Sequence, residues 1–595
     1  MKLHQLAAFF VFTMLISCTQ TPQPPKEGNP LLTLRYEQNE TVTYYEAIEM
    51  YQKLDKHYPQ AKLLSYGKTD AGKPLHLFVM SADGKFDAAS AKKTGKTVVL
   101  INNGIHPGEP EGIDASLQFA DDVLRNKDGM TAWLKNTVIC IIPVYNVGGC
   151  LNRSAYHRTG QTTPKECGYR GNAKNLDLNR DFAKMETGNA RAFAAIFREW
   201  DPDVFLDTHT TNGSEHQYVI TLIPYQDCSL PESLGRFFRN EMIPEMYKQM
   251  ATTPYELIPY VNYINESPKQ GISLDYQPPK FSTGYTGLFN TLGFMTENQI
   301  YAPFPDRVKS VYFFMKFMTE FTHNHSDTIL ALRKEAEEAT IKQKEFVIGW
   351  KMDTSRFETI RFKGYEAEMG ISPVTGLERF GFNLSKPYDT IVPYFDWFVP
   401  TKTIKAPTYY ILPQAWDNVV ENMKINNVKM FRLTKDTTLL VERYYITDYK
   451  TSEYSYNWHR YHTDVTISPM MEKVDFYEGD YVIPMNQEAN RYIVEMLEPV
   501  AEDSFFRWNF FDPCLESREY YSSYGFEANA QKYLDEHPDF KKQFEEACKT
   551  DPKLANNHRA RLGYIYNNTE WADNRVGRYP VVRVNEEVRL PVEGK

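Results

Sequence analysis

The chain has 595 residues, which is too long for one ordinary hydrophobic core, so two or three domains are expected. Hydrophobic residues make up 42% and charged residues 24% of the chain, as in an ordinary folded protein. The formal net charge is −10, and no run of clustered lysines and arginines occurs. Because phosphate binding needs such clusters, this composition argues against a nucleic-acid partner.

The first segment predicts export followed by lipid attachment. An apolar run over residues 6–17 is too short to span a bilayer as a stable helix and fits the core of a signal peptide. The run ends in Leu-Ile-Ser-Cys, which resembles the bacterial lipobox, where the cysteine becomes the acylated N-terminus. We therefore expect residues 1–18 to be a lipoprotein signal peptide and Cys18 to be lipidated.

The segment after Cys18 predicts a tether and a location. Residues 19–34 are rich in proline, glutamine and threonine and are expected to form a linker without regular structure. Thr19 stands where inner-membrane lipoproteins usually carry aspartate. The sequence thus predicts an outer-membrane lipoprotein of the cell envelope, attached to the membrane through its N-terminal lipid.

From about residue 41 to residue 325, short apolar strands alternate with amphipathic helices. The predicted strands are Leu75–Ser81, Thr97–Asn102, Val138–Asn146, Val204–Asp207 and Gly293–Thr296. The predicted helices are Tyr44–His57, Pro110–Leu124, Asn189–Trp200 and Leu234–Gln249. This alternation predicts an α/β fold with a mostly parallel sheet that is covered by helices on both faces.

The character of the chain changes after a charged helix that is predicted over residues 326–346 and is interpreted as a linker. Residues 347–595 are expected to form a β-rich accessory region of one or two units. Its predicted strands are Phe357–Tyr365, Tyr409–Leu412, Met430–Leu433 and Thr438–Thr447. Its predicted helices are Trp416–Ile425, Gln487–Leu497 and Ala528–Cys548.

Six cysteines remain beyond Cys18. In an oxidising compartment they could pair, and Cys150 with Cys167 is the natural candidate because the two are close in sequence. No CxxC spacing that would indicate a structural zinc site occurs.

Residues suited to metal binding and proton transfer follow three of the predicted strands. His106 and Glu109 lie in the loop after the second strand, His209 follows the fourth strand, and Glu297 follows the last. Ligands bind at the carboxyl ends of strands in open α/β sheets, and a catalytic zinc needs three protein ligands and an open position. His106, Glu109 and His209 therefore predict one Zn²⁺ per chain. Other histidines, which lack partners at ligand spacing, are interpreted as surface or packing residues: His216, His323, His325, His459 and His462.

The ordered set resembles the zinc metallocarboxypeptidases of the carboxypeptidase A type, the funnelins. The family's HxxE motif is present at His106 to Glu109, its Asp-x-Asn-Arg setting at Asp177 to Arg180, its distal zinc histidine at His209 and its catalytic glutamate at Glu297. The resemblance covers about residues 35–325. It implies that this range is a catalytic domain with a mostly parallel or mixed sheet of the eight-stranded type.

The resemblance also implies roles in catalysis. Zinc would lower the pKa of its bound water, and Glu297 would take the water's proton and pass it to the leaving amine. Arg170 is expected to stabilise the oxyanion, with Arg158 and Arg153 from the same loop as alternatives. Asp177 is expected to orient a zinc-bound histidine from behind.

Substrate binding is expected to involve three further residues. Asn179 and Arg180 would hold the terminal carboxylate of the substrate, a role that suits the planar guanidinium fork. Tyr285 is expected to cap the bound substrate, with Tyr276 as the alternative.

Together these features predict a zinc-dependent metallocarboxypeptidase that acts on peptides with a free C-terminus. An N-acyl amino acid deacylase and a peptidoglycan stem-peptide carboxypeptidase are alternatives that would use the same zinc site. A lipoprotein that only binds peptides is a third alternative, which the complete set of ligands and Glu297 disfavours.

Overall fold

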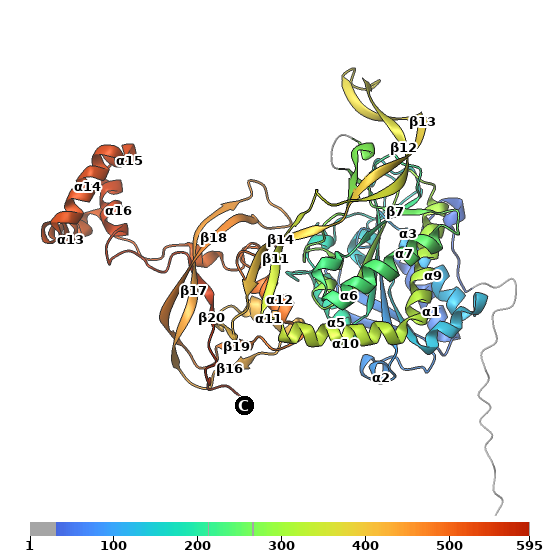
Figure 1. The fold of residues 1–595 in the computed structure, drawn as a ribbon, viewed down its shortest axis with the longest axis horizontal. Helices are drawn as coiled ribbons and strands as arrows, with labels where there is room; N and C mark the ends of the chain where they lie inside the picture. The colour runs from blue at the N-terminus through green and yellow to red at the C-terminus, as the bar shows by residue number, and fades with distance from the viewer. Residues whose placement is uncertain (1–30, 212, 264–266, 594–595) are drawn as a thin grey trace, which may run out of the picture.

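The computed structural model describes residues 31–211, 213–263 and 267–593. Cys18, the predicted signal peptide and most of the predicted tether lie outside the described residues. Figure 1 shows an α/β half, a β-rich half beside it and a small group of helices at the far end. Across the described ranges, no helix has the length and apolar character needed to cross a membrane.

A mixed eight-stranded sheet forms the centre of the first half, in the order β1-β2-β4-β3-β5-β10-β6-β7. The four central strands β4, β3, β5 and β10 run parallel to one another, whereas β1, β2 and β6 join by antiparallel pairing. The predicted α/β class with a mixed eight-stranded sheet is therefore confirmed. The strands are β1 (Ala61–Lys68), β2 (Pro74–Met80), β3 (Thr97–Asn103), β4 (Thr137–Ile142), β5 (Val204–Thr210), β6 (Ile220–Pro224), β7 (Leu257–Pro259) and β10 (Leu292–Asn298).

Helices cover both faces of this sheet, because successive side chains of each buried strand point to opposite sides. In β3, Val99 and Ile101 pack into one hydrophobic cluster, and Val98 and Leu100 pack into the other. The first cluster is covered by α1 (Tyr44–His57), α3 (Glu111–Leu124), α7 (Ile243–Met250) and α9 (Phe304–Asn324). The second is covered by α5 (Gly188–Trp200) and α8 (Ser282–Gly287).

The second half follows α10 (Ser326–Lys342), which ends before residue 346 because β11 begins at Glu345. Its main sheet has six strands in the order β16-β19-β15-β20-β17-β18. These strands are β15 (Tyr409–Leu412), β16 (Phe431–Arg432), β17 (Thr437–Thr451), β18 (His462–Phe476), β19 (Tyr481–Pro484) and β20 (Arg578–Val584). Two smaller pairings use β11 (Glu345–Met352) with β14 (Phe398–Lys405), and β12 (Glu358–Ile371) with β13 (Glu378–Phe395).

The helices of the second half lie in two places. α11 (Asp417–Ile425) and α12 (Asn490–Leu497) pack against the sheets. A separate helical group, drawn in red in Figure 1, has its own small core; it comprises α13 (Ser523–Glu536), α14 (Pro538–Thr550), α15 (Pro552–Ala555) and α16 (His558–Asn567). The single helix predicted over 528–548 is thus two helices, because Pro538 disfavours helical backbone at the residue before it.

The two halves share one hydrophobic core. The cluster under α5 continues from Leu100 and Phe193 of the first half into Tyr410 and Ile493 of the second. In addition, β13 of the second half pairs with β9 (Ile272–Ser273) of the first. The second half therefore packs directly against the first and is not a separate domain that follows it on a linker.

The cysteine pairing suggested by sequence spacing is not present. Cys150 and Cys167 are both free and buried. Cys150 packs into the cluster that contains α1, whereas the thiol of Cys167 points to the carbonyl oxygen of His157, 3.9 Å away. Proximity along the chain did not place the two sulfur atoms together, because the loop between them turns their side chains toward different neighbours.

Candidate metal centre and substrate pocket

Three neighbouring parallel strands bring the candidate ligands to one edge of the sheet. His209 is the penultimate residue of β5, and Glu297, the penultimate residue of β10, lies opposite it in the parallel register. Beyond β3, which pairs with β5 on the other side, Gly104 adopts a φ of 66° and the chain turns toward His106. The arrangement follows directly from the strand order, since carboxyl ends of parallel strands meet.

The loop that carries Glu109 ends where α3 packs closely on β5. A Cβ atom at Gly112 would lie 2.0 Å from Thr208 Oγ1, so any side chain at this position would push the helix away from the strand. A turn closed by the hydrogen bond from Glu109 N to His106 O (2.8 Å) sets the spacing of the two ligands. Glu111 lies beyond this turn and faces Arg307, so it does not compete with Glu109.

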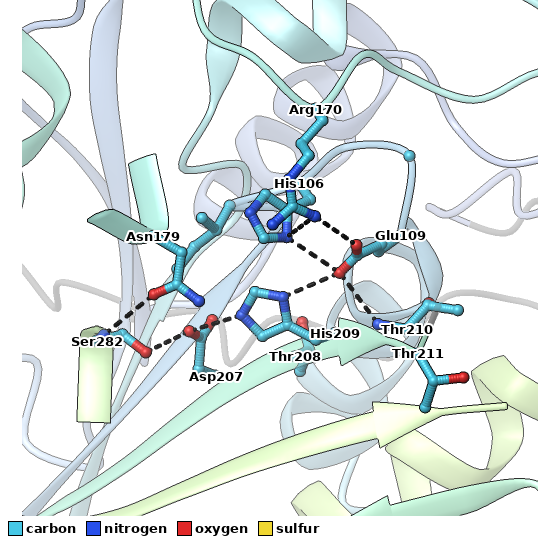
Figure 2. A network of polar contacts seen from close by, with 12 residues as sticks. His106, Glu109, Arg170, Asn179, Asp207, Thr208, His209, Thr210, Thr211 and Ser282 are labelled. Carbon is cyan, nitrogen blue, oxygen red and sulfur yellow. Dashed lines mark hydrogen bonds and ion pairs between the residues drawn. The ribbon is translucent and has the colours of Figure 1, made fainter. Parts of the chain in front are cut away.

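His106, Glu109 and His209 place three donor atoms within 4.8 Å of one another, and all three side chains are buried. Figure 2 shows both imidazole rings facing the carboxylate of Glu109. Glu109 Oε2 lies 2.9 Å from His209 Nδ1 and 3.3 Å from His106 Nδ1. Donors about 2.0–2.1 Å from a tetrahedral zinc are about 3.3 Å apart, so this set fits the ion.

Each histidine is held from behind by an aspartate. His106 Nε2 is 3.0 Å from Asp177 Oδ1, and His209 Nε2 is 2.9 Å from Asp207 Oδ2. Asp207 in turn accepts a hydrogen bond from Ser282 Oγ. Because Nε2 is engaged in both rings, Nδ1 is left to face the metal position, as such carboxylate partners commonly arrange.

Charged neighbours outweigh the effect of burial at two of the three candidate ligands. Burial opposes ionisation of Glu109, but His106 and Arg158 outweigh it and hold the pKa of this carboxyl well below its usual range. Burial likewise opposes the charged form of His209, but Asp207 raises the pKa of the imidazole well above its usual value. The carboxyl groups of Glu109, Asp177 and Asp207 therefore surround the two histidines, and Arg158 and Arg170 pair with two of them.

Glu297 lies next to these ligands without being one of them. Its Oε2 atom is buried and has no hydrogen-bond partner within the described part of the chain. Burial, together with the nearby charge of Glu109, raises the pKa of Glu297 to about 8. A carboxyl group with a raised pKa and a free oxygen beside a metal site is suited to take up and release a proton.

A cavity of about 230 Å³ opens beside the ligands. Arg170, Asn179 and Arg180 line it together with Glu297 and the three metal-site residues. The lining also includes Thr210, Thr211, Ile223, Tyr260, Asp275, Gln277, Phe281 and Met295. The structure therefore brings every predicted metal, proton-transfer and carboxylate-binding residue into one pocket.

The three candidate arginines occupy different places. Arg170 lines the pocket, where its Nε and Nη2 atoms lie 3.0 and 2.8 Å from Asp177 Oδ2. Arg158 lies behind Glu109, to which its Nη1 donates, while its Nη2 donates to the carbonyl oxygens of Thr210 and Thr211. Arg153 donates to backbone carbonyl oxygens outside the pocket. Arg170 is the arginine of this loop that can face a bound substrate.

The expected capping role of Tyr285 is wrong for this arrangement. Tyr285 is fully buried in α8, packs against Phe197 and donates from its hydroxyl to Asn426 Oδ1 at 2.7 Å. The alternative, Tyr276, packs against Phe398 and also lies outside the pocket lining. The tyrosine that lines the pocket is Tyr260, just after β7.

Two residues of the site were missed from the sequence. Asp207 could have been found, because residues two apart on a strand share one face and Asp207 stands two before His209. Tyr260 carries no such signal, because it reaches the pocket through the pairing of β7 at the edge of the sheet.

Comparisons with known proteins agree with this geometry. Residues 47–211 match the zinc carboxypeptidase family. Carboxypeptidase 2 of Trichophyton rubrum is 19% identical to this chain over 454 residues, which cover 74% of this chain and 78% of that protein. Carboxypeptidase 2 of Trichophyton equinum is 20% identical over 456 residues, which also cover 74% of this chain and 78% of that protein.

Solved structures give weaker likenesses. The carboxypeptidase A of Helicoverpa armigera is 14% identical, with a TM-score of 0.38 over 52% of this chain and 78% of that chain. A metallo-carboxypeptidase from Burkholderia cenocepacia is 16% identical, with a TM-score of 0.36 over 48% of this chain and 70% of that chain. Residues 47–211 of this chain therefore contain a zinc carboxypeptidase domain, and the chain is similar to carboxypeptidases over 74% of its length.

Proposed function

We propose that this chain removes single residues from the C-termini of peptides, with zinc held by His106, Glu109 and His209. One observation carries the proposal: Arg180 and Glu297 line the same small cavity as the three metal-site residues. At about 230 Å³ the cavity is below the roughly 300–1,000 Å³ typical of drug-sized ligands, and it suits one terminal residue better than a long segment.

The position of each residue in the pocket suggests its role in peptide hydrolysis. Bound zinc would lower the pKa of a water molecule toward neutrality and polarise the scissile carbonyl. Glu297 would accept the water's proton at Oε2 and return it to the leaving amine. Arg170 would donate to the oxygen of the scissile carbonyl as charge develops there, while Asp177 holds both this arginine and His106 in place.

Asn179 and Arg180 would bind the terminal carboxylate. Arg180 Nη1 donates to the carbonyl oxygen of Asn179 at 2.7 Å, and its guanidinium lies 4.6 Å from the centre of the Phe281 ring. Nη2 has no hydrogen-bond partner among the residues that the structure describes. A carboxylate can therefore pair with this edge of the fork, and a charge-assisted pair exceeds a neutral contact.

The test compares peptides that differ only in a free or an amidated C-terminus. Amidation removes the charge that Arg180 pairs with, which costs about 2–5 kcal/mol in a desolvated site, so free peptides are expected to be cleaved roughly 10² to 10³-fold better. Arg180→Ala is expected to abolish this preference by slowing cleavage of the free peptide. Equal turnover of both forms by the unmodified protein would instead indicate an endopeptidase or an N-acyl amino acid deacylase, and muropeptides in the same panel address the stem-peptide alternative.

We also propose that the protein is anchored to the outer membrane through lipidated Cys18. Several acyl chains anchor a protein stably, whereas one binds only marginally. Cys18→Ala is expected to leave the precursor unprocessed or to release the protein from the membrane fraction. Mass spectrometry that finds an unmodified Cys18 in mature, membrane-bound protein would exclude this route.

A further inference from the structure

A turn from the second half of the chain contacts Asp177 and Arg180, and Arg180 lines the substrate pocket. The turn connects β17 to β18 and is closed by two hydrogen bonds, from Tyr456 N to His459 O (2.7 Å) and from His459 N to Tyr456 O (3.1 Å). Its central residues, Asn457 and Trp458, have φ values of 49° and 79°. Such a turn suits Asn-Gly, and a tryptophan in this conformation is strained. Strain of this kind persists where the surroundings hold the backbone in place, and it is common at functional sites.

The turn is docked on the backbone that carries Arg180. Asn457 Oδ1 accepts a hydrogen bond from Asp177 N (2.9 Å), and Asn457 Nδ2 donates to Asp177 O (3.3 Å). Asp177 is the capping residue of the short 3₁₀ helix Leu178–Arg180. The side chain of Asn457 therefore fixes the start of the segment from which Arg180 extends.

Tyr456 fixes the guanidinium itself. Its hydroxyl accepts a hydrogen bond from Arg180 Nε. Tyr456 holds Nε and the Asn179 carbonyl oxygen holds Nη1, so the orientation of the Arg180 guanidinium is fixed. Its Nη2 atom is left to bind a ligand. An arginine that is free to rotate would lose this orientation each time a substrate left the site.

Tyr456 is in turn immobilised by its surroundings. Its ring stacks on Trp508 at 5.9 Å between centroids with an interplanar angle of 18°. At the other end of the turn, His459 Nε2 lies 2.7 Å from Glu186 Oε2, a carboxylate that also pairs with Lys184. The turn is thus held from both halves of the chain.

We propose that Tyr456 and Asn457 are positioning residues of the carboxylate subsite, so that the second half of the chain sets the preference for a free C-terminus. The inference rests on the proposed function of Arg180. It assigns residues 456–457, which lie far outside the matched carboxypeptidase segment, to the substrate site of that domain.

Full-length Tyr456→Phe and Tyr454→Phe form a matched pair for the test. Tyr454 lies in the same loop and is 78% exposed. With peptides that differ only in a free or amidated C-terminus, Tyr456→Phe is expected to raise KM for the free peptide about 10-fold, as for the loss of one hydrogen bond that orients a charged group, with kcat within about 2-fold. Tyr454→Phe is expected to match the unmodified protein. In an Arg180→Ala background, Tyr456→Phe is expected to have no further effect.

Asn457→Gly provides a second variant if Tyr456→Phe does not fold, because glycine keeps the positive φ and removes only the amide. It is expected to raise KM for the free peptide in the same way. If the unmodified protein prefers the free peptide but Tyr456→Phe behaves like Tyr454→Phe, the inference is overturned and the proposed function stands. An equal effect on both peptides, or an effect that persists without Arg180, would also overturn it. A protein that never discriminates between the two peptides would overturn both proposals.

Discussion

Glu297 lies opposite His209 in the parallel pairing of β10 with β5, so a free carboxyl and a metal-facing imidazole project from adjacent strands. This register is rigid, because both strands are buried and hydrogen-bonded on each side. The sequence predicted a metal ligand at His209 from its place at a strand end, and a proton-transfer role for Glu297 from the resemblance. In the structure, His209 is one of the three residues that could hold a metal ion, and Glu297 lies beside them with a buried oxygen that has no hydrogen-bond partner among the described residues.

Zinc content is expected to depend on each histidine of the set. His106→Ala and His209→Ala should each lower bound zinc from one ion per chain to a small fraction, because a three-ligand centre does not survive the loss of one donor. His216→Ala is the matched control, since His216 is also buried but lies outside the set and should leave zinc unchanged. Metal analysis of the purified variants decides the matter, and full zinc in His209→Ala would refute the ligand set.

Glu297→Gln is expected to keep zinc while kcat falls by a factor of roughly 10² or more, the usual result of losing a general base. Glutamine preserves the shape of the side chain, and the backbone carbonyl of residue 297 still accepts from Thr221 Oγ1. The measurement pairs metal content with steady-state kinetics on one preparation. Loss of zinc in this variant would instead make Glu297 a ligand.

Tyr285 in the core and Tyr260 in the pocket are expected to affect different properties of the protein. Tyr285→Phe should leave kcat/KM unchanged but lower the free energy of unfolding by about 1–3 kcal/mol, because Asn426 loses its buried partner. Tyr260→Phe should change kcat/KM and leave stability nearly unchanged, because Tyr260 lines the pocket. Kinetics and denaturation are measured on both variants. A change in kcat/KM for Tyr285→Phe would mean that Tyr285 reaches the substrate.

Asp114 gives a prediction about pH. Burial in α3 raises the pKa of this carboxyl to about 7, and its Oδ1 atom has no hydrogen-bond partner in the described part of the chain. The folded state therefore binds the proton more tightly than the unfolded state, in which the pKa is about 3.9. The resulting stability is complete below about pH 4 and is lost as the pH rises through 7.

The Asp114→Asn variant has no ionisable carboxyl group at this position. From pH 5 to pH 8, the stability of the variant relative to the unmodified protein is expected to rise by about 2–3 kcal/mol, from the linkage of one proton. Urea denaturation at the two pH values measures it. Asp122→Asn, in the same helix, should destabilise at both pH values, because Lys127 loses its ion pair and Arg125 keeps only the pair with Asp121. A constant difference between Asp114→Asn and the unmodified protein would mean that Asp114 ionises normally.

The three metal-site residues could be predicted from the sequence because residues at the ends of strands can be recognised from the apolar runs that precede them. His106, His209 and Glu297 each follow an apolar run, and parallel strands must bring these ends together. Tyr285 shows the limit, because its distance in sequence from Glu297 says nothing about whether α8 turns it into the core or the pocket. The contact of Asn457 with Asp177, 280 residues apart, depends on the packing of the two halves and left no local pattern.

The core that runs from Leu100 into Tyr410 and Ile493 has a consequence for how this protein loses its structure. A cut near residue 346 would not release two stable pieces, because each would expose the apolar face that the other covers. Heat or denaturant should therefore disrupt both sheets in a single cooperative step, while the red helical group, with its separate core, is free to melt on its own. The thermal stability of the metal pocket therefore depends in part on core residues of the second half, such as Tyr410 and Ile493.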